Sequence, residues 1–131
     1  MIGLDTNVIV RYLAQDDPQQ SPRATNLFER QLTVEVPGFI SLVAMAETIW
    51  VLERSYGLSP RELASAIELL LQTDVLVVEH EQEVFTAMIA LKQGQGDFAD
   101  ALIAALGAKA GCRHTLTFDQ KALRLPGFRR A

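Results

Sequence analysis

Four carboxylates occur at positions where an α/β chain would bring them to one edge of its sheet. Asp5 ends the apolar run of residues 1–5, and Asp119 ends a second strand-like run, residues 114–119. Glu47 and Asp100 lie in segments whose patterns are typical of helices. Clustered carboxylates repel one another unless a cation neutralises them, so such a cluster indicates a divalent metal site. Oxygen ligands without histidine or thiolate favour Mg²⁺ or Mn²⁺ over zinc.

Glu47 is the acid with the most unusual surroundings. It is the only charged residue between Leu42 and Leu52, and its helical neighbours three and four positions away are all apolar. Burying a lone carboxylate costs several kcal/mol by order of magnitude unless it is liganded or protonated. A buried Glu47 would therefore indicate a ligand. The alternative is that Glu47 lies on a partly exposed stripe of its helix.

Each of the other acids also has a structural explanation. Asp5 precedes a helix-like segment and is a suitable N-cap. Asp97 and Asp100 lie three residues apart on one helix face. Asp97 could cap the helix, and the negative charge of Asp100 in the first turn could interact favourably with the helix dipole. Asp119 could end a turn or cap a short helix at Gln120–Leu123. Capping and metal binding are compatible, because a carboxylate has two oxygens.

Apolar runs alternate with helix-like segments along the chain. Strands are predicted at 2–5, 34–41, 75–79 and 115–118. Helices are predicted from Ser21-Pro22 to about residue 32, over Leu42–Tyr56, from the capping box at Ser59 to about residue 71, over Glu81–Gln93 and over Phe98–Ala110. This alternation predicts an α/β fold with a parallel sheet, in which ligands bind beyond the carboxyl ends of the strands.

Length and composition limit the class of protein. The 131 residues are enough for one domain, 1–131, with a single core. One cysteine, Cys112, excludes an intrachain disulfide and is interpreted as a small core residue. No signal sequence opens the chain and no apolar run is long enough to span a membrane, so we expect a cytoplasmic protein with no membrane partner.

Charge is distributed unevenly along the chain. The net charge is −4, yet residues 109–131 hold six basic residues against the single acid Asp119, a net charge of +5. Residues 1–108 hold six basic and fifteen acidic residues, a net charge of −9. The basic segment is either an ordinary solvated surface or a rim that holds phosphates beside an acidic site.

Four sequence motifs, in order, resemble those of the PIN-domain nucleases, and among them the VapC-type toxins of toxin–antitoxin pairs. The matching pieces are Leu4-Asp5-Thr6-Asn7-Val8, Ala46-Glu47, Asp100-Ala-Leu-Ile-Ala104 and Thr117-Phe-Asp119. The resemblance implies a three-layer α/β/α sandwich with a mainly parallel central sheet, and Mg²⁺- or Mn²⁺-dependent cleavage of RNA. It also implies homodimers and inhibition by a cognate antitoxin protein.

The resemblance also implies roles for individual residues. Asp5, Glu47 and Asp100 match the core acids, and Asp119 matches a more variable fourth acid. Asp97 is an additional carboxylate that would reach a second metal or cap its helix. The remaining matches, which would be supporting polar groups, are Thr6, Asn7 and Thr117. The family often has an asparagine-rich segment after the last strand, whereas this chain has Phe118-Asp119-Gln120.

These features predict a ribonuclease in which one or two metal ions activate water for attack on the phosphodiester. Arg113, Lys121 and Arg124 are candidates for binding the RNA backbone. Single-stranded or looped RNA is favoured over a duplex, whose deep groove resists readout by side chains. The alternatives are a non-catalytic PIN-like nucleic-acid-binding module and a nuclease acting on DNA. A receiver-like signalling domain is disfavoured, because no strand in the middle of the chain ends in a suitable aspartate.

Overall fold

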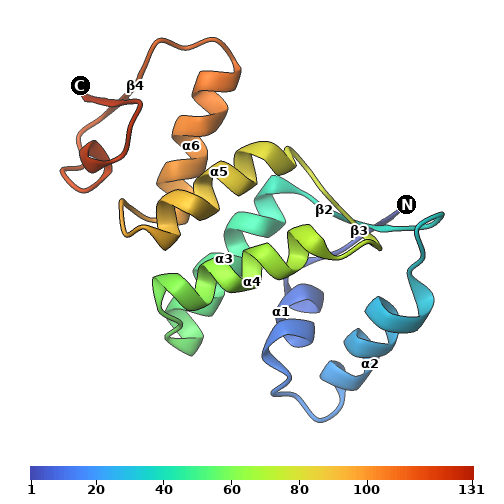
Figure 1. Cartoon of the computed structure of the whole chain (residues 1–131). Coiled ribbons are helices and arrows are strands. Elements are labelled where there is room, and N and C mark those ends of the chain that lie inside the picture. The colour runs from blue at the N-terminus through green and yellow to red at the C-terminus, as the bar shows by residue number, and fades with distance from the viewer.

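The chain contains five short strands and six α-helices, with two α-helices between successive strands from β1 to β4, and the computed structural model describes all residues, 1–131 (Figure 1). The strands are β1 Ile2–Gly3, β2 Gly38–Ile40, β3 Leu76–Val78, β4 Thr115–Thr117 and β5 Phe128–Arg130. The helices are α1 Thr6–Ala14, α2 Gln20–Asn26, α3 Leu42–Tyr56, α4 Pro60–Gln72, α5 Glu81–Lys92 and α6 Phe98–Lys109. All strand pairs are parallel, which confirms the predicted α/β class and parallel pairing.

Local capping chemistry sets the ends of α3 and α4, as the sequence predicts. Ser41 accepts a hydrogen bond from the Ala44 N–H at the start of α3, and Gly57 ends this helix with a left-handed φ of 66°. Ser59 and Glu62 form the predicted capping box, in which each side chain accepts a hydrogen bond from the other residue's N–H. These helices therefore begin and end for reasons that are visible in the sequence.

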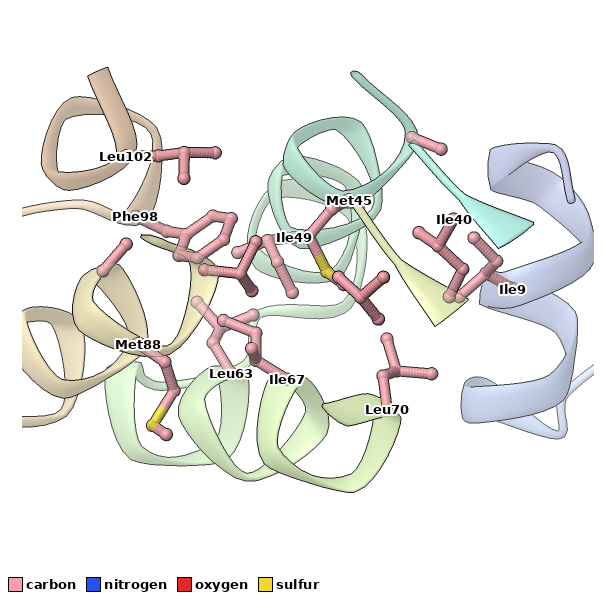
Figure 2. Packing of buried hydrophobic residues seen from close by; sticks show 14 of the residues in the cluster. Ile9, Ile40, Met45, Ile49, Leu63, Ile67, Leu70, Met88, Phe98 and Leu102 are labelled. Carbon is pink, nitrogen blue, oxygen red and sulfur yellow. The ribbon is translucent and has the colours of Figure 1, made fainter. Parts of the chain in front are cut away.

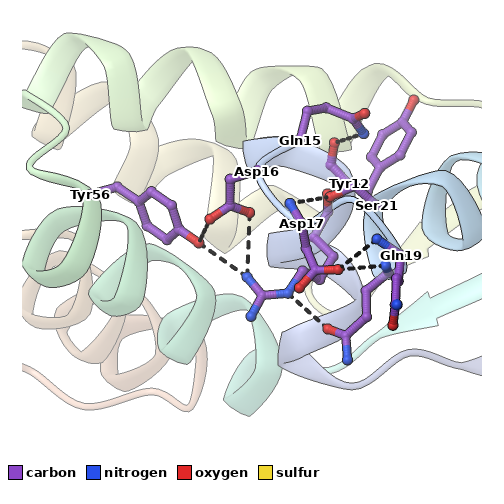
Figure 3. A network of polar contacts seen from close by, with 9 residues as sticks. Tyr12, Gln15, Asp16, Asp17, Gln19, Ser21 and Tyr56 are labelled. Atoms are coloured by element: carbon purple, nitrogen blue, oxygen red, sulfur yellow. Dashed lines mark hydrogen bonds and ion pairs between the residues drawn. The ribbon is translucent and has the colours of Figure 1, made fainter.

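The predicted start of α2 is wrong. Ser21 does not cap this helix; its hydroxyl donates to the Arg11 carbonyl at 2.8 Å. The carboxylate of Asp17 accepts hydrogen bonds from the N–H groups of Gln19 and Gln20 instead, and α2 begins at Gln20 (Figure 3). These two bonds also lower the pKa of Asp17. A five-residue π-helix, Leu27–Gln31, then extends α2 almost to the predicted end.

The first sheet has the strand order β1-β2-β3. Leu4, Ile40 and Val78 are buried on one of its faces, where they join a single apolar cluster with residues of α1, α3 and α4 (Figure 2). The opposite face carries, in register, Gly3, Phe39 and Val77. These three residues are partly or fully exposed, so the sheet buries one face more deeply than the other.

The second sheet consists only of β4 and β5 and lies beside α6, away from β1–β3 (Figure 1). Two glycines allow this close packing. A Cβ atom added at Gly107 would lie 2.8 Å from the Thr115 hydroxyl oxygen, and one added at Gly96 would lie 2.7 Å from Leu125. The sequence pattern does not indicate this division into two sheets, because alternation alone does not specify which strands are neighbours.

Three further features at the carboxyl-terminal end differ from expectation. Strand β5 is not predicted by the sequence, and the short helix expected at Gln120–Leu123 is a 3-10 turn at Ala122–Arg124. Cys112 is exposed, so its interpretation as a core residue is wrong. It lies in the turn after α6, where Gly111 adopts a φ of 96°. Among the helices, none combines the length and the apolar character needed to cross a membrane.

The capping box at α4 gives a direct test of these local interactions. Replacing Ser59 with alanine should lower the free energy of unfolding by about 1 kcal/mol, because one helix N–H loses its partner. For a chain of this length the midpoint of thermal unfolding should fall by about 3–4 °C, measured by circular dichroism. Ser65→Ala, at an exposed position within α4, should leave the midpoint unchanged or raise it slightly. Equal midpoints for Ser59→Ala and the unmodified protein would contradict this account.

Candidate functional site

Asp5 lies at the carboxyl end of β1 and caps α1. Its Oδ1 atom accepts a hydrogen bond from the Thr6 N–H at 2.7 Å. The side chain is exposed, and its second oxygen has no hydrogen-bond partner within the chain. Asp5 therefore caps the helix with one oxygen and leaves the other available to a ligand, as the two interpretations of this residue allow.

Glu47 is held next to Asp5 by a hydrogen bond between α1 and α3. The hydroxyl of the buried Thr6 donates to Glu47 Oε1. Glu47 itself is exposed, whereas its neighbours Met45 and Thr48 are buried, so the argument that burial would force Glu47 to take a ligand is wrong. The alternative, an exposed position on the helix, is the one that the structure shows. What singles out Glu47 is its position beside Asp5.

A pocket of about 680 Å³ contains both carboxylates and lies mainly between α1 and α3. Arg11, Trp50 and Tyr56 also line it. The Arg11 guanidinium donates to the Tyr56 hydroxyl at 3.1 Å and pairs with Asp16 at 3.4 Å (Figure 3). Tyr56 in turn donates to Asp16 at 2.7 Å, which raises the pKa of the tyrosine. The pocket thus holds carboxylates and a positioned cation.

Three residues that line the pocket, Arg11, Trp50 and Tyr56, were not predicted from the sequence. Helical spacing could have identified Arg11 and Trp50 as neighbours of predicted site residues. Arg11 follows Asn7 by four residues, and Trp50 follows Glu47 by three, so each lies on the same helix face as a predicted site residue. Tyr56 lies nine residues beyond Glu47, and only the packing of α3 beside α1 brings it to the pocket.

A second group of acids lies at the start of α6 and the end of β4. Asp97 caps α6 by accepting a hydrogen bond from the Asp100 N–H at 2.8 Å. Asp119 accepts from the Lys121 N–H at 2.9 Å and donates its own N–H to the Thr117 hydroxyl. The Thr117 hydroxyl therefore fixes the backbone at Asp119.

The acids of this second group perturb one another. Partial burial raises the pKa of Asp100, and the negative charges of Asp97 and Asp119 raise it further. A hydrogen bond that the protonated carboxyl of Asp100 donates to Asp97 also raises the pKa of Asp100. The folded protein therefore favours protonation of Asp100 more than an isolated aspartate does, and a bound cation would remove this repulsion.

The structure does not bring the two groups together. Asp5 and Glu47 lie in the pocket between α1 and α3, whereas Asp97, Asp100 and Asp119 belong to α6 and the second sheet. No three side chains of histidine, cysteine or acidic residues lie close enough to hold a metal ion in this arrangement. The first group therefore holds two of the five predicted acids and the second holds three.

A comparison with protein-family models decides the family. The model described as the PIN domain matches residues 2–127, almost the whole chain. The chain belongs to the PIN domain family. PIN domains are generally nucleases and typically use divalent metal ions, and the parallel strands and six helices are consistent with a PIN-like α/β/α sandwich. No curated protein is similar enough to the chain to count as a relative.

The candidate residues of this PIN domain fit a hard divalent cation. Every candidate ligand is a carboxylate, and the supporting side chains of Thr6, Asn7 and Thr117 also offer oxygen atoms. The pKa of Asp100 is raised first by partial burial and then by the charges of Asp97 and Asp119, and such an ion would offset this charge repulsion. The ligands predicted from the sequence, Asp5, Glu47 and Asp100 with Asp119 or Asp97 in a fourth place, have suitable oxygen donors but are divided between the two groups in this chain.

The pKa of Asp100 can be measured by NMR titration of its side-chain carboxyl. We expect a value above the ordinary 3.8 in the metal-free protein. Asp97→Asn should lower it, because asparagine keeps the N-cap but removes a negative charge. Asp74→Asn, an exposed position between α4 and β3, should not change it. An unperturbed Asp100, or equal effects of the two variants, would contradict the proximity of these acids.

The same shift has a consequence for stability. The pKa of Asp100 is higher in the folded than in the unfolded protein. Its contribution to stability is therefore fully present at pH values below its unfolded-state pKa and is lost as the pH rises through its folded-state pKa. In Asp97→Asn this loss on raising the pH from about 4 to 7 should be smaller, which denaturant unfolding at several pH values would show.

Proposed function

We propose that this PIN domain is a metal-dependent endoribonuclease that acts in the cytoplasm as the toxin of a VapBC-type toxin–antitoxin pair. The observation that carries the catalytic part is the Thr6–Glu47 hydrogen bond, which fixes Glu47 beside Asp5 in a pocket that also holds Arg11. Asp100, on α6, is the third acid of the motif set. The toxin assignment is supported by the order of the four motifs in the sequence.

The reaction would be hydrolysis of an RNA phosphodiester. A bond forms between phosphorus and a water oxygen, the bond to the leaving ribose oxygen breaks, and that oxygen takes up a proton. One or two Mg²⁺ or Mn²⁺ ions, when bound, supply a water of lowered pKa and stabilise the leaving oxygen. The chain itself supplies fixed ligand positions, since Asp5 and Asp119 are oriented by backbone hydrogen bonds and Glu47 is oriented by Thr6.

Other residues of the pocket are suited to binding the substrate. Arg11 is fixed by Tyr56 and Asp16 and can contact a phosphate. Trp50 has 57% of its surface exposed beside Glu47 and offers a face on which an unpaired base can stack. A stacking surface favours single-stranded or looped RNA over a regular duplex.

Cleavage of a labelled single-stranded RNA in the presence of Mn²⁺ tests the proposal. Cleavage should stop when a chelator is added and should fall by about 100-fold or more in Asp5→Asn, Glu47→Gln and Asp100→Asn. Matched controls that remove one surface carboxylate each, Asp74→Asn and Glu68→Gln, should retain activity. Binding of RNA without metal-dependent cleavage would favour the non-catalytic module, and preferential cleavage of a DNA of the same sequence would favour a DNA nuclease.

The basic residues near the carboxyl terminus are proposed to bind the RNA backbone. Arg113, Lys121 and Arg124 are exposed, and none of them forms an ion pair within the chain. Changing each to glutamine should weaken RNA binding and reduce the slope of log K against log salt by about 0.7. Arg61→Gln, at the exposed start of α4, should leave the slope unchanged. Unchanged slopes in all the variants would indicate an ordinary solvated surface.

The proposed partner of a toxin of this type is a small antitoxin. The genes next to the one that encodes this chain test this part of the proposal, and no purified protein is needed. A short reading frame that overlaps or adjoins the gene, with a DNA-binding amino-terminal part and an amphipathic tail, is expected. A gene standing alone would argue against the toxin role while leaving the nuclease proposal intact.

A further inference from the structure

Four strands have an unpaired edge, and two of them, β1 and β4, are followed within two residues by a candidate aspartate, Asp5 or Asp119. β1 pairs only with β2, and β4 pairs only with β5. Apolar side chains on these strands are unusually exposed: 45% of Ile2, 58% of Leu116 and, just after β4, 87% of Phe118. Unpaired edges with exposed apolar side chains are templates for pairing with another strand.

The two strands have the same sequence pattern, with apolar residues at alternate positions followed by an aspartate. When their terminal aspartates are aligned in parallel, Ile2-Gly-Leu-Asp5 lies against Leu116-Thr-Phe-Asp119. Side chains paired in this register share a face of the sheet at about 4.8 Å strand spacing. Ile2 and Leu4 then lie beside Leu116 and Phe118 on one face. The two carboxylates meet at the same carboxyl-terminal edge of the sheet.

The β4–β5 pair cannot reach β1 of its own chain without loss of packing. It is held on α6 by the contacts of Gly107 with Thr115 and of Gly96 with Leu125. α6 is itself anchored, because Phe98 is buried in the same apolar cluster as residues of α3 and α4 (Figure 2). Exposing a large apolar side chain of this kind costs about 1.5–3 kcal/mol. The partner for β1 is therefore sought in a second copy.

The surface area is consistent with such a partner. The chain exposes 7958 Å². A compact monomer of the same mass exposes about 6,900 Å². The excess is about 1,000 Å², comparable with the roughly 800 Å² that each partner buries in a standard interface.

We infer that two copies of this chain form a dimer with two-fold symmetry in which β4 of each copy pairs with β1 of the other. Each of the two resulting sites combines Asp5 and Glu47 of one copy with Asp97, Asp100 and Asp119 of the other. The catalytic consequence of this strand exchange rests on the proposed nuclease function. The pairing itself does not.

Complementation between two inactive variants tests the composite site. Asp5→Asn and Asp100→Asn chains, each with a different affinity tag, are co-expressed, and dimers carrying both tags are purified. Exchange leaves one of the two sites with all its acids, so Mn²⁺ binding and RNA cleavage should return to about half the level of the unmodified dimer. If unmodified protein is active and the mixed dimer is as inactive as either variant, the exchange is wrong.

Cross-linking tests the pairing without metal or activity, in a Cys112→Ser background. Ile2→Cys chains mixed with Leu116→Cys chains should give a covalent dimer with a short bifunctional thiol reagent. Val34→Cys, exposed in the loop before β2, should give none with Leu116→Cys. A chain carrying both Ile2→Cys and Leu116→Cys should also give dimers, whereas an internally cross-linked monomer would show closure within one chain and overturn the inference. If the unmodified protein neither binds Mn²⁺ nor cleaves RNA, the proposed function fails and this experiment still decides the exchange.

Discussion

Repulsion between carboxylates is the constraint that any assembly of this candidate site has to meet. Five acids of the candidate site divide into a pair, Asp5 and Glu47, and a trio at α6 and β4. In the pair, the neutral hydroxyl of Thr6 donates to Glu47 and draws it towards Asp5. In the trio, partial burial and the negative charges of Asp97 and Asp119 together raise the pKa of Asp100. Bringing both groups together would increase this repulsion, which a divalent ion would offset.

The position of β4 decides whether the two groups meet. A parallel sheet places the carboxyl ends of neighbouring strands at one edge, and Asp5 and Asp119 each follow a strand. In the isolated chain these strands belong to different sheets. The glycines at 96 and 107 let the segment that contains the second sheet pack directly against α6 and the loop before it. Separation of the acids and exposure of apolar strand residues therefore have the same origin.

Local features of the fold could be predicted from the sequence, and long-range ones could not. The ends of α3 and α4 follow from Ser41, Gly57 and the Ser59 capping box, because each contact spans three or four residues. The start of α2 was missed because Asp17 competes with Ser21 as the capping residue. Sheet membership was missed because hydrophobic patterns show that a segment is a strand without showing its neighbour.

The candidate site shows the same limit. Acids were identified from residue type and motif order, and Thr117 from the family motif that it shares with Asp119. The exposure of Glu47 was not predictable from its apolar neighbours, since a helix whose other faces are covered can still leave one position open to solvent. Tyr56 required knowledge of how α3 packs beside α1, and no local pattern contains that information.

The capping roles of Asp5, Asp97 and Asp119 bear on how such a site is held before any ligand binds. Each of these carboxylates accepts a hydrogen bond from a nearby backbone N–H, which limits its rotation. A ligand that is already oriented loses less conformational entropy when it coordinates an ion. Structural and functional interpretations of these aspartates are therefore not rivals: the oxygen that caps the backbone orients the oxygen that remains free. Glu47 gains the same restriction from Thr6, across two helices instead of within one turn.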